Sequence, residues 1–159
     1  MKKIVNRLNI WLVWISSVSV LVILVLMFAD ALLRKIFLPI PGAFETNLGL
    51  MVIVFFFPLA AVQMRRGHVN VDLLTSRLGK KWSTLLNVVA SLLGIVAFGI
   101  LAYASLVKAW QSTLDCEFWY GLINYPVWPF RWVMLIGVAM LVMQLFITLI
   151  DDFFEWRKQ

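Results

Sequence analysis

Long uncharged runs dominate the pattern of hydrophobic and polar positions along the chain. The four runs are Ile10–Ala29, Leu48–Val62, Leu85–Val107 and Trp132–Ile150. A helix needs about 20 mainly apolar residues to cross the hydrocarbon core of a bilayer. Each run reaches or approaches that length, the second by extending back to Ala43. The pattern therefore predicts an all-α membrane protein with one domain, residues 1–159, and four transmembrane helices at about 10–29, 43–63, 84–107 and 130–150.

The composition agrees with membrane insertion. Hydrophobic residues make up 63% of the chain, against about 45–50% in soluble domains, and the charged residues cluster between the runs. The basic start of the chain and the triplet Ala29-Asp30-Ala31 resemble a cleaved signal peptide. The first apolar run, however, is longer than the ~7–15 residues typical of such a peptide. We therefore expect an uncleaved first helix.

Basic residues are distributed unequally between the two sides of the predicted bundle. Ten lie in the N-terminal segment, the second loop and the C-terminal segment, whereas the first and third loops hold four: Arg34, Lys35, Lys108 and Arg131. The side richer in Lys and Arg is normally cytoplasmic, so both termini are predicted in the cytoplasm. The net charge of +6 then reflects topology and suits anionic lipid headgroups. It does not indicate nucleic-acid binding, because the sequence offers no basic groove outside the membrane.

The second loop predicts a short helix lying at the cytoplasmic membrane surface. Val71, Leu74 and Leu78 fall on one helical face, away from Asp72, which favours an amphipathic helix in the interface. The alternation over residues 68–73 also fits a strand. An unpaired strand would leave backbone groups unsatisfied at the membrane, so the helix is the preferred interpretation.

The third loop predicts a second interfacial helical segment, on the outer side, into which the third helix continues. Trp110, Leu114 and Phe118 share one helical face, and aromatic side chains favour the headgroup level. Cys116, the only cysteine of the chain, lies in the same segment and is expected to be a small apolar filler.

Polar residues also gather where the first two helices meet. Asp30 and Arg34 are one helical turn apart and are predicted to pair, and the prolines of Leu38–Gly42 then end the helix. Glu45 follows in the first turn of the second helix, where the helix dipole favours a carboxylate and a salt bridge with Arg34 is an alternative. These three residues are predicted to form a polar cluster on the outer side that fixes both helices. Further along, Pro58 is expected to bend the second helix.

Residues that carry catalytic or cofactor chemistry are scarce. The chain has one histidine, His68, and one cysteine. Each of three common membrane sites needs more histidine or cysteine residues than this: a haem held by two axial histidines, a zinc site and a quinone-linked dithiol centre. The sequence contains neither a phosphate-binding glycine loop nor a serine-hydrolase motif. It therefore predicts no enzyme activity, no cofactor and no metal site.

The middle of each predicted span is uncharged, and this bears on transport. Ion-coupled transporters usually place ionisable residues or broken helices near the midplane, and small multidrug exporters use a glutamate inside their first span. Here that span holds none, and Glu45 lies near the start of the second. We therefore expect an auxiliary subunit, with a self-contained transporter acting as a homo-oligomer as the alternative. Contacts with a partner helix are expected at small residues: Ser16, Ser19, Gly94, Gly99, Gly137 and Ala139.

The order of these features resembles a known family. Arg34 ends the first helix, Glu45 opens the second, and Arg-Arg-Gly-His-Val-Asn-Val-Asp-Leu-Leu follows over residues 65–74. A Pro-Val-Trp-Pro motif over residues 126–129 leads into the fourth helix. Over nearly its whole length the chain resembles the small membrane subunit of tripartite ATP-independent periplasmic (TRAP) transporters.

The resemblance implies a non-catalytic scaffold. In that family the small subunit binds a large multi-span permease subunit, which holds the substrate and sodium sites and works by an elevator motion. A periplasmic substrate-binding protein docks on the pair. Family substrates are mostly carboxylates, including C4-dicarboxylates and sialic acids. The resemblance therefore implies sodium-coupled uptake of an organic acid across the bacterial inner membrane, with this chain as a stationary wall beside the moving subunit.

The candidate site residues are interpreted as structural or partner contacts. They are Asp30, Arg34, Glu45, Arg65, Arg66, His68 and Asp72. The last four lie in a predicted corner made of a helix end, a turn and the surface helix, where Arg65 and Arg66 reach the headgroups and Gly67 permits the turn. His68 and Asp72 are expected to cap or cross-link this corner, or to touch the large subunit. The outer cluster is predicted near the docking surface for the binding protein.

Overall fold

The computed structural model describes residues 2–36, 39–64, 80–119 and 124–157 of the chain. The helices and strands are α1 (Lys2–Ile36), α2 (Ala43–Phe56), α3 (Leu59–Met64), α5 (Lys80–Leu114), β1 (Phe118–Trp119), β2 (Tyr125–Pro126) and α6 (Trp128–Arg157). Within these described ranges, four helical stretches are long and apolar enough to cross a membrane: Val5–Lys35, Ala43–Met64, Val88–Leu114 and Trp128–Phe154. The predicted all-α fold with four membrane-length helices is therefore confirmed.

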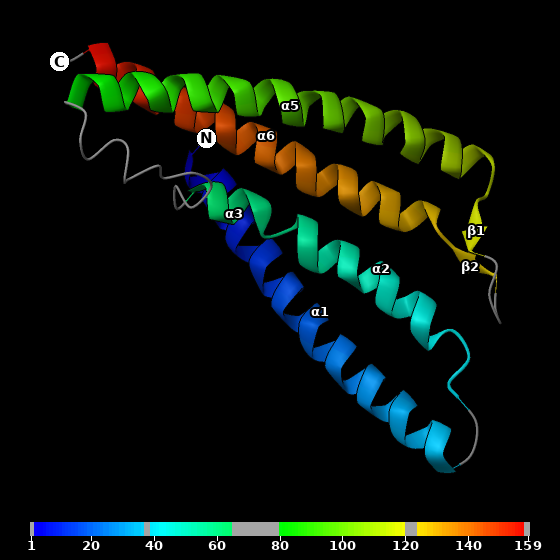
Figure 1. Ribbon diagram of the computed structural model, residues 1–159. Coiled ribbons are helices and arrows are strands. Elements are labelled where there is room, and N and C mark those ends of the chain that lie inside the picture. The colour runs from blue at the N-terminus through cyan, green and yellow to red at the C-terminus, as the bar shows by residue number, and fades with distance from the viewer. Residues whose placement is uncertain (1, 37–38, 65–79, 120–123, 158–159) are drawn as a thin grey trace.

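The helices lie in a row in the order α1, α2–α3, α6, α5, and each contacts mainly its neighbours in that row (Figure 1). α1 and α2 form one helical hairpin, and α5 and α6 form the other. The turn between α1 and α2 and the strands β1 and β2 lie at one end of the row, which we call the turn end. The first residues of α1 and the last of α6 lie towards the opposite end, the terminal end. α1 and α5 are the two edges of the row.

Two glycines allow α2 and α6 to approach closely. A Cβ added at Gly137 of α6 would lie 2.7 Å from Cβ of Phe56 and 2.8 Å from its carbonyl oxygen. A Cβ added at Gly49 of α2 would overlap the ring of Phe130. In each helix the glycine and the phenylalanine are seven residues apart, so the two contacts lie two turns apart along the same parallel seam. This reciprocal arrangement joins the two hairpins.

Several small residues contact helices of the same chain. Gly137 meets Phe56 of α2, and Gly94 of α5 lies beside Leu145 of α6. The Ser16 hydroxyl reaches α2. Gly137 and Ser16 are buried in these contacts, so their expected use in partner contacts is wrong; for Gly94, which is half-buried, it stays a prediction.

Pro58 interrupts the second membrane-length helix, as predicted from the sequence. α2 ends at Phe56 and α3 begins at Leu59. Proline has no backbone N–H, so the carbonyl oxygen of Val54, four residues earlier, has no helical donor. The hydroxyl of Ser16 in α1 donates to that oxygen at 3.3 Å. In lipid, where water is absent, such replacement of a lost backbone hydrogen bond permits a helix break.

The outer segment after α5 differs from the predicted interfacial helix. α5 continues to Leu114 and then ends at Cys116, whose φ of 45° is left-handed. The N–H of Glu117 donates to the carbonyl oxygen of Ser112 at 3.0 Å, which is a Schellman-type helix end. Phe118 then lies in β1, opposite Pro126 of β2. The third helix therefore continues through Trp110 and Leu114 as predicted, whereas Phe118 does not belong to it, because the left-handed residue reverses the chain.

Cys116 also differs from its expected role. Its side chain is exposed, so the interpretation as an apolar filler is wrong. The cysteine occupies the position after a helix where glycine is usual, and its backbone conformation rather than its packing determines the local structure.

A buried amide pair links α1 to α6. Asn9 Nδ2 donates to Gln144 Oε1 at 3.1 Å, and both residues are buried. Gln63 of α3 is buried as well, and the parallel register of the α2–α6 seam places it opposite Gln144. Buried polar residues of three helices therefore lie at the same depth of the row.

Replacing Gly137 with alanine is expected to weaken the α2–α6 contact. The added methyl group would meet the Phe56 backbone, which cannot rotate away, so Gly137→Ala should lower the free energy of unfolding by about 1–3 kcal/mol. Gly99→Ala is the control, because nothing lies within 4 Å of a Cβ at that position. Thermal unfolding of both variants in the same detergent measures the difference, and equal losses would contradict the close contact.

Removing the Ser16 hydroxyl is expected to leave the Val54 carbonyl oxygen without a donor. Ser16→Ala should destabilise the fold by about 1 kcal/mol. Ser17→Ala should change it little, because Ser17 bonds only to Val13 of its own helix. In a Pro58→Ala background, position 58 regains an N–H that can reach Val54, so the cost of Ser16→Ala should shrink. A double-mutant cycle of unfolding free energies measures this coupling, and strictly additive effects would refute the assignment.

Candidate functional site

Asp30 organises the turn between α1 and α2. The residue is buried, with 7% of its surface exposed. One carboxylate oxygen accepts a hydrogen bond from Nε of Arg34 at 2.7 Å, and the other accepts one from the backbone N–H of Ile40 at 2.9 Å. The predicted pairing of Asp30 with Arg34 is therefore confirmed. The same carboxylate also holds the chain as it turns towards α2.

The start of α2 places Glu45 beside this turn. Gly42 has a φ of 81°, which glycine adopts easily. Its carbonyl oxygen accepts hydrogen bonds from the N–H and the hydroxyl of Thr46 at 2.9 and 2.8 Å. Glu45 is half-buried in the same first turn. It makes no ion pair within the described part of the chain, so the alternative of a salt bridge with Arg34 is wrong, and its place at the positive end of the α2 dipole is the remaining interpretation.

The second predicted corner falls outside the described residues. Arg65, Arg66, His68 and Asp72 belong to the segment 65–79, as does the surface helix expected from Val71 to Leu78. Their roles therefore stay predictions from the sequence.

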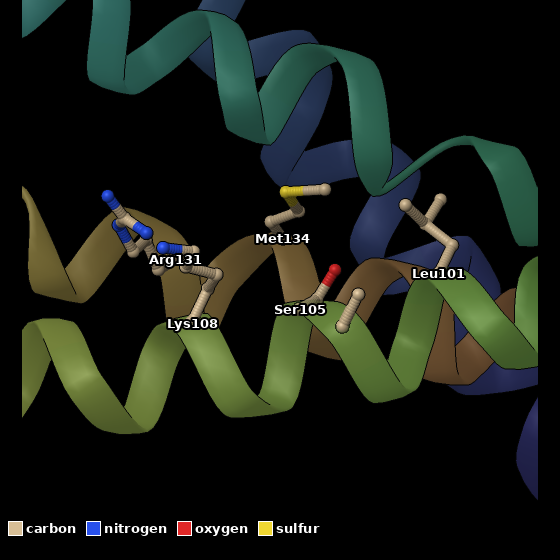
Figure 2. A pocket seen from close by; sticks show the side chains of 6 residues that line it. Leu101, Ser105, Lys108, Arg131 and Met134 are labelled. Carbon is tan, nitrogen blue, oxygen red and sulfur yellow. The ribbon is translucent and has the colours of Figure 1, made fainter.

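A cleft of about 370 Å³ lies between α5 and α6 towards the turn end (Figure 2). Its lining residues are Leu101, Ala104, Ser105, Lys108, Arg131 and Met134. Arg131 Nη2 lies 2.7 Å from the carboxylate of Glu117. Lys108 is exposed and has no ion pair among the described residues, and the buried hydroxyl of Ser105 has no hydrogen-bond partner there. The cleft thus combines two cations, one of them unpaired, with an unpartnered hydroxyl and apolar walls.

A stripe of exposed apolar side chains runs along α2 and α3. It consists of Phe44, Met51, Phe55 and Val62, which are 39–66% exposed. Their spacing of seven, four and seven residues places them on one helical face. We call this set the α2 stripe. Exposed apolar surface of this kind is covered in a membrane protein either by lipid or by another subunit.

The cleft was not predicted from the sequence, although part of its signal is present there. Leu101, Ser105 and Lys108 are spaced by four and three residues, which places them on one helical face. A single sequence gives no indication that Arg131 lies opposite this face, because the pairing depends on the register between α5 and α6.

Comparison with known proteins addresses the family directly. The family model described as "Tripartite ATP-independent periplasmic transporters, DctQ component" matches residues 23–155, a range that runs from within α1 to the last turns of α6. Comparisons with curated proteins and with solved structures gave no match. The matched range contains the Asp30 turn, the α2 stripe and the α5–α6 cleft. The chain therefore belongs to the DctQ family, the small permease component of tripartite ATP-independent periplasmic transporters.

Proposed function

We propose that the chain is the scaffold subunit of a sodium-coupled TRAP transporter for an organic acid of the sialic acid or C4-dicarboxylate class. It has no catalytic activity of its own. In the bacterial inner membrane it binds a large multi-span permease subunit, and a periplasmic substrate-binding protein docks on the pair. The α2 stripe is the observation that carries the proposal.

The position of the α2 stripe supports a partner within the membrane. α1 and α6 contact the two sides of α2 and leave the face with Phe44, Met51, Phe55 and Val62 open. Aromatic residues and methionine are enriched in protein interfaces. Between helices in lipid, association comes from van der Waals packing and hydrogen bonds, and these large side chains provide the surface for such packing.

The hydrogen bonds of α1 support a stationary role. The Asp30 carboxylate holds the Ile40 backbone at the turn end, and Ser16 reaches Val54 about half-way along the helix pair. Asn9 then bonds to α6 nearer the terminal end. A helix held at three depths cannot slide along its neighbours without breaking these bonds. A subunit that moves through the membrane requires a rigid neighbouring surface, because it has to slide along helices that do not shift with it.

The distribution of charge supports cytoplasmic termini. The N-terminal segment, the second loop and the C-terminal segment carry ten basic residues in the sequence, and the first and third loops carry four; the richer side is normally cytoplasmic. With this orientation the Asp30 turn lies on the periplasmic side. That is the side from which a substrate-binding protein approaches.

Purification of the tagged chain in mild detergent from its native host tests the proposal. We expect a stoichiometric, much larger multi-span permease in the purified sample, identified by mass spectrometry. The double variant Met51→Ala/Phe55→Ala removes the centre of the α2 stripe and should reduce the recovered permease at least about tenfold, since two interface anchors together contribute ~1.4 kcal/mol or more.

The matched control is Leu93→Ala/Ile100→Ala, which truncates equally exposed apolar residues on the α5 edge of the row and should leave recovery unchanged. If the wild-type chain purifies only with itself and catalyses uptake in liposomes, it is instead a self-contained homo-oligomeric transporter, and the scaffold proposal fails.

The single native cysteine allows the orientation to be measured. Cys116 is exposed at the turn end, so a membrane-impermeant maleimide should label it in intact spheroplasts. The Cys116→Ser variant has no cysteine and serves as the unlabelled control. In that background Phe154→Cys places a thiol near the terminal end, and it should be labelled only after the membrane is permeabilised. The reverse pattern would place the termini in the periplasm.

A further inference from the structure

We propose that the cleft between α5 and α6 binds the headgroup of an anionic phospholipid from the membrane leaflet at the turn end. The phosphate lies against Lys108 and Arg131, and the upper part of an acyl chain follows Leu101, Ala104 and Met134. This inference requires only that the chain is inserted in a membrane, so it does not depend on the scaffold role proposed above.

The charge in the cleft favours a ligand with a net negative charge. Arg131 is paired with Glu117 at 2.7 Å, which leaves part of its guanidinium free to donate further hydrogen bonds. Lys108 lines the same cleft without an ion pair in the described part of the chain. The three groups together carry one net positive charge, which a phosphodiester headgroup with one net negative charge neutralises.

The level of these cations in the membrane fits a headgroup. Lys108 lies six residues before the end of α5 at Leu114, and Arg131 lies three residues after the start of α6 at Trp128. At the same level the indole N–H of Trp132 donates to the Thr113 hydroxyl at 2.9 Å. Tryptophan favours the boundary between headgroups and hydrocarbon. The cations are therefore placed where lipid phosphates lie.

The order of residues along the cleft fits an amphipathic ligand. From the turn end inwards on α5 the lining residues are Lys108, then Ser105, then Ala104 and Leu101; on α6 Met134 lies one turn inside Arg131 (Figure 2). Charge is thus followed by a hydroxyl and then by apolar groups. A lipid presents the same sequence with depth, from phosphate to ester groups to acyl chain. A free phosphate or a soluble carboxylate would use only the outer part.

Ser105 gives the cleft a polar group without a partner in the chain. The residue is 7% exposed, and its Oγ is buried without a hydrogen bond among the described residues. A buried hydroxyl without a partner costs about 1–3 kcal/mol. Rotation of the Ser105 side chain towards the cleft that it lines would let an ester carbonyl oxygen of a lipid seated below the phosphate accept its hydrogen bond, which would remove that cost.

Native mass spectrometry of the full-length chain in detergent tests the proposal. The chain is mixed with equal amounts of dioleoyl phosphatidylglycerol and dioleoyl phosphatidylcholine, and the retained lipids are counted. We expect one phosphatidylglycerol per chain, retained in preference to phosphatidylcholine. Lys108→Gln should reduce that preference about tenfold, the effect of losing ~1.4 kcal/mol of binding free energy.

Two matched controls separate a site from general attraction. Lys35→Gln removes one exposed positive charge at the same end of the row, on the α1 edge, and should leave lipid retention unchanged. Ala104→Phe fills the apolar part of the cleft without changing charge and should reduce retention of both lipids, whereas Ala139→Phe, at an exposed position outside the cleft, should not. Thermal unfolding of each variant identifies any loss of fold.

Four results would overturn the proposal. The first is equal retention of the two lipids by the wild-type chain. The second is an equal effect of Lys108→Gln and Lys35→Gln, which would indicate attraction to net charge rather than a site. The third is full displacement of phosphatidylglycerol by millimolar inorganic phosphate, which would identify a simple anion site. Co-purified permease that expels the lipid would likewise assign the cations to a protein carboxylate.

Discussion

The close approach of α2 and α6 at Gly137 is the contact on which the arrangement of the four membrane helices depends. Lipid chains are as apolar as leucine, so helices in a bilayer associate through close packing and hydrogen bonds. Gly137 and Gly49 each receive a phenylalanine of the other helix, and this fixes a parallel register. α1 is attached to this pair through α2, and α5 is attached through α6. The row therefore has one main seam, between α2–α3 and α6, and the Asn9–Gln144 hydrogen bond adds a direct link from α1 to α6.

The same register determines where polar side chains can be enclosed. It continues from Gly137 to the buried cluster of Ala60 with Leu141, and one turn further it brings Gln63 opposite Gln144. Asn9 of α1 completes this group with its hydrogen bond to Gln144. Because an unsatisfied polar group in lipid costs several kcal/mol, the hydrogen bond specifies the depth of α1 as well as its neighbour. Packing and hydrogen bonding thus select the same register.

Sequence patterns predicted what depends on residues close in the chain. The membrane-length helices follow from long apolar runs, the Asp30–Arg34 pair from a spacing of four, and the break at Pro58 from the chemistry of proline. The hydrogen bond of Ser16 to Val54 and the cleft around Arg131 join residues far apart in sequence, so they depend on helix register, which a single sequence does not determine. The outer helical segment ends before Phe118 for a third reason: Cys116 adopts a left-handed conformation, which the composition of the segment does not reveal.

A row of helices, as opposed to a compact bundle, has a physical consequence for an accessory subunit. A bundle buries most of its apolar surface within itself. A row leaves part of every helix exposed to a partner subunit at every depth of the membrane. In lipid this exposure carries little penalty, since lipid solvates apolar side chains. What a row lacks is lateral rigidity, because its edges have one neighbour each. The α1 edge has Asp30 and Asn9 to hold it, whereas the α5 edge has the β1–β2 hairpin and the Arg131–Glu117 pair at one end. A lipid bound between α5 and α6 would add a cross-link towards the turn end of the α5 edge.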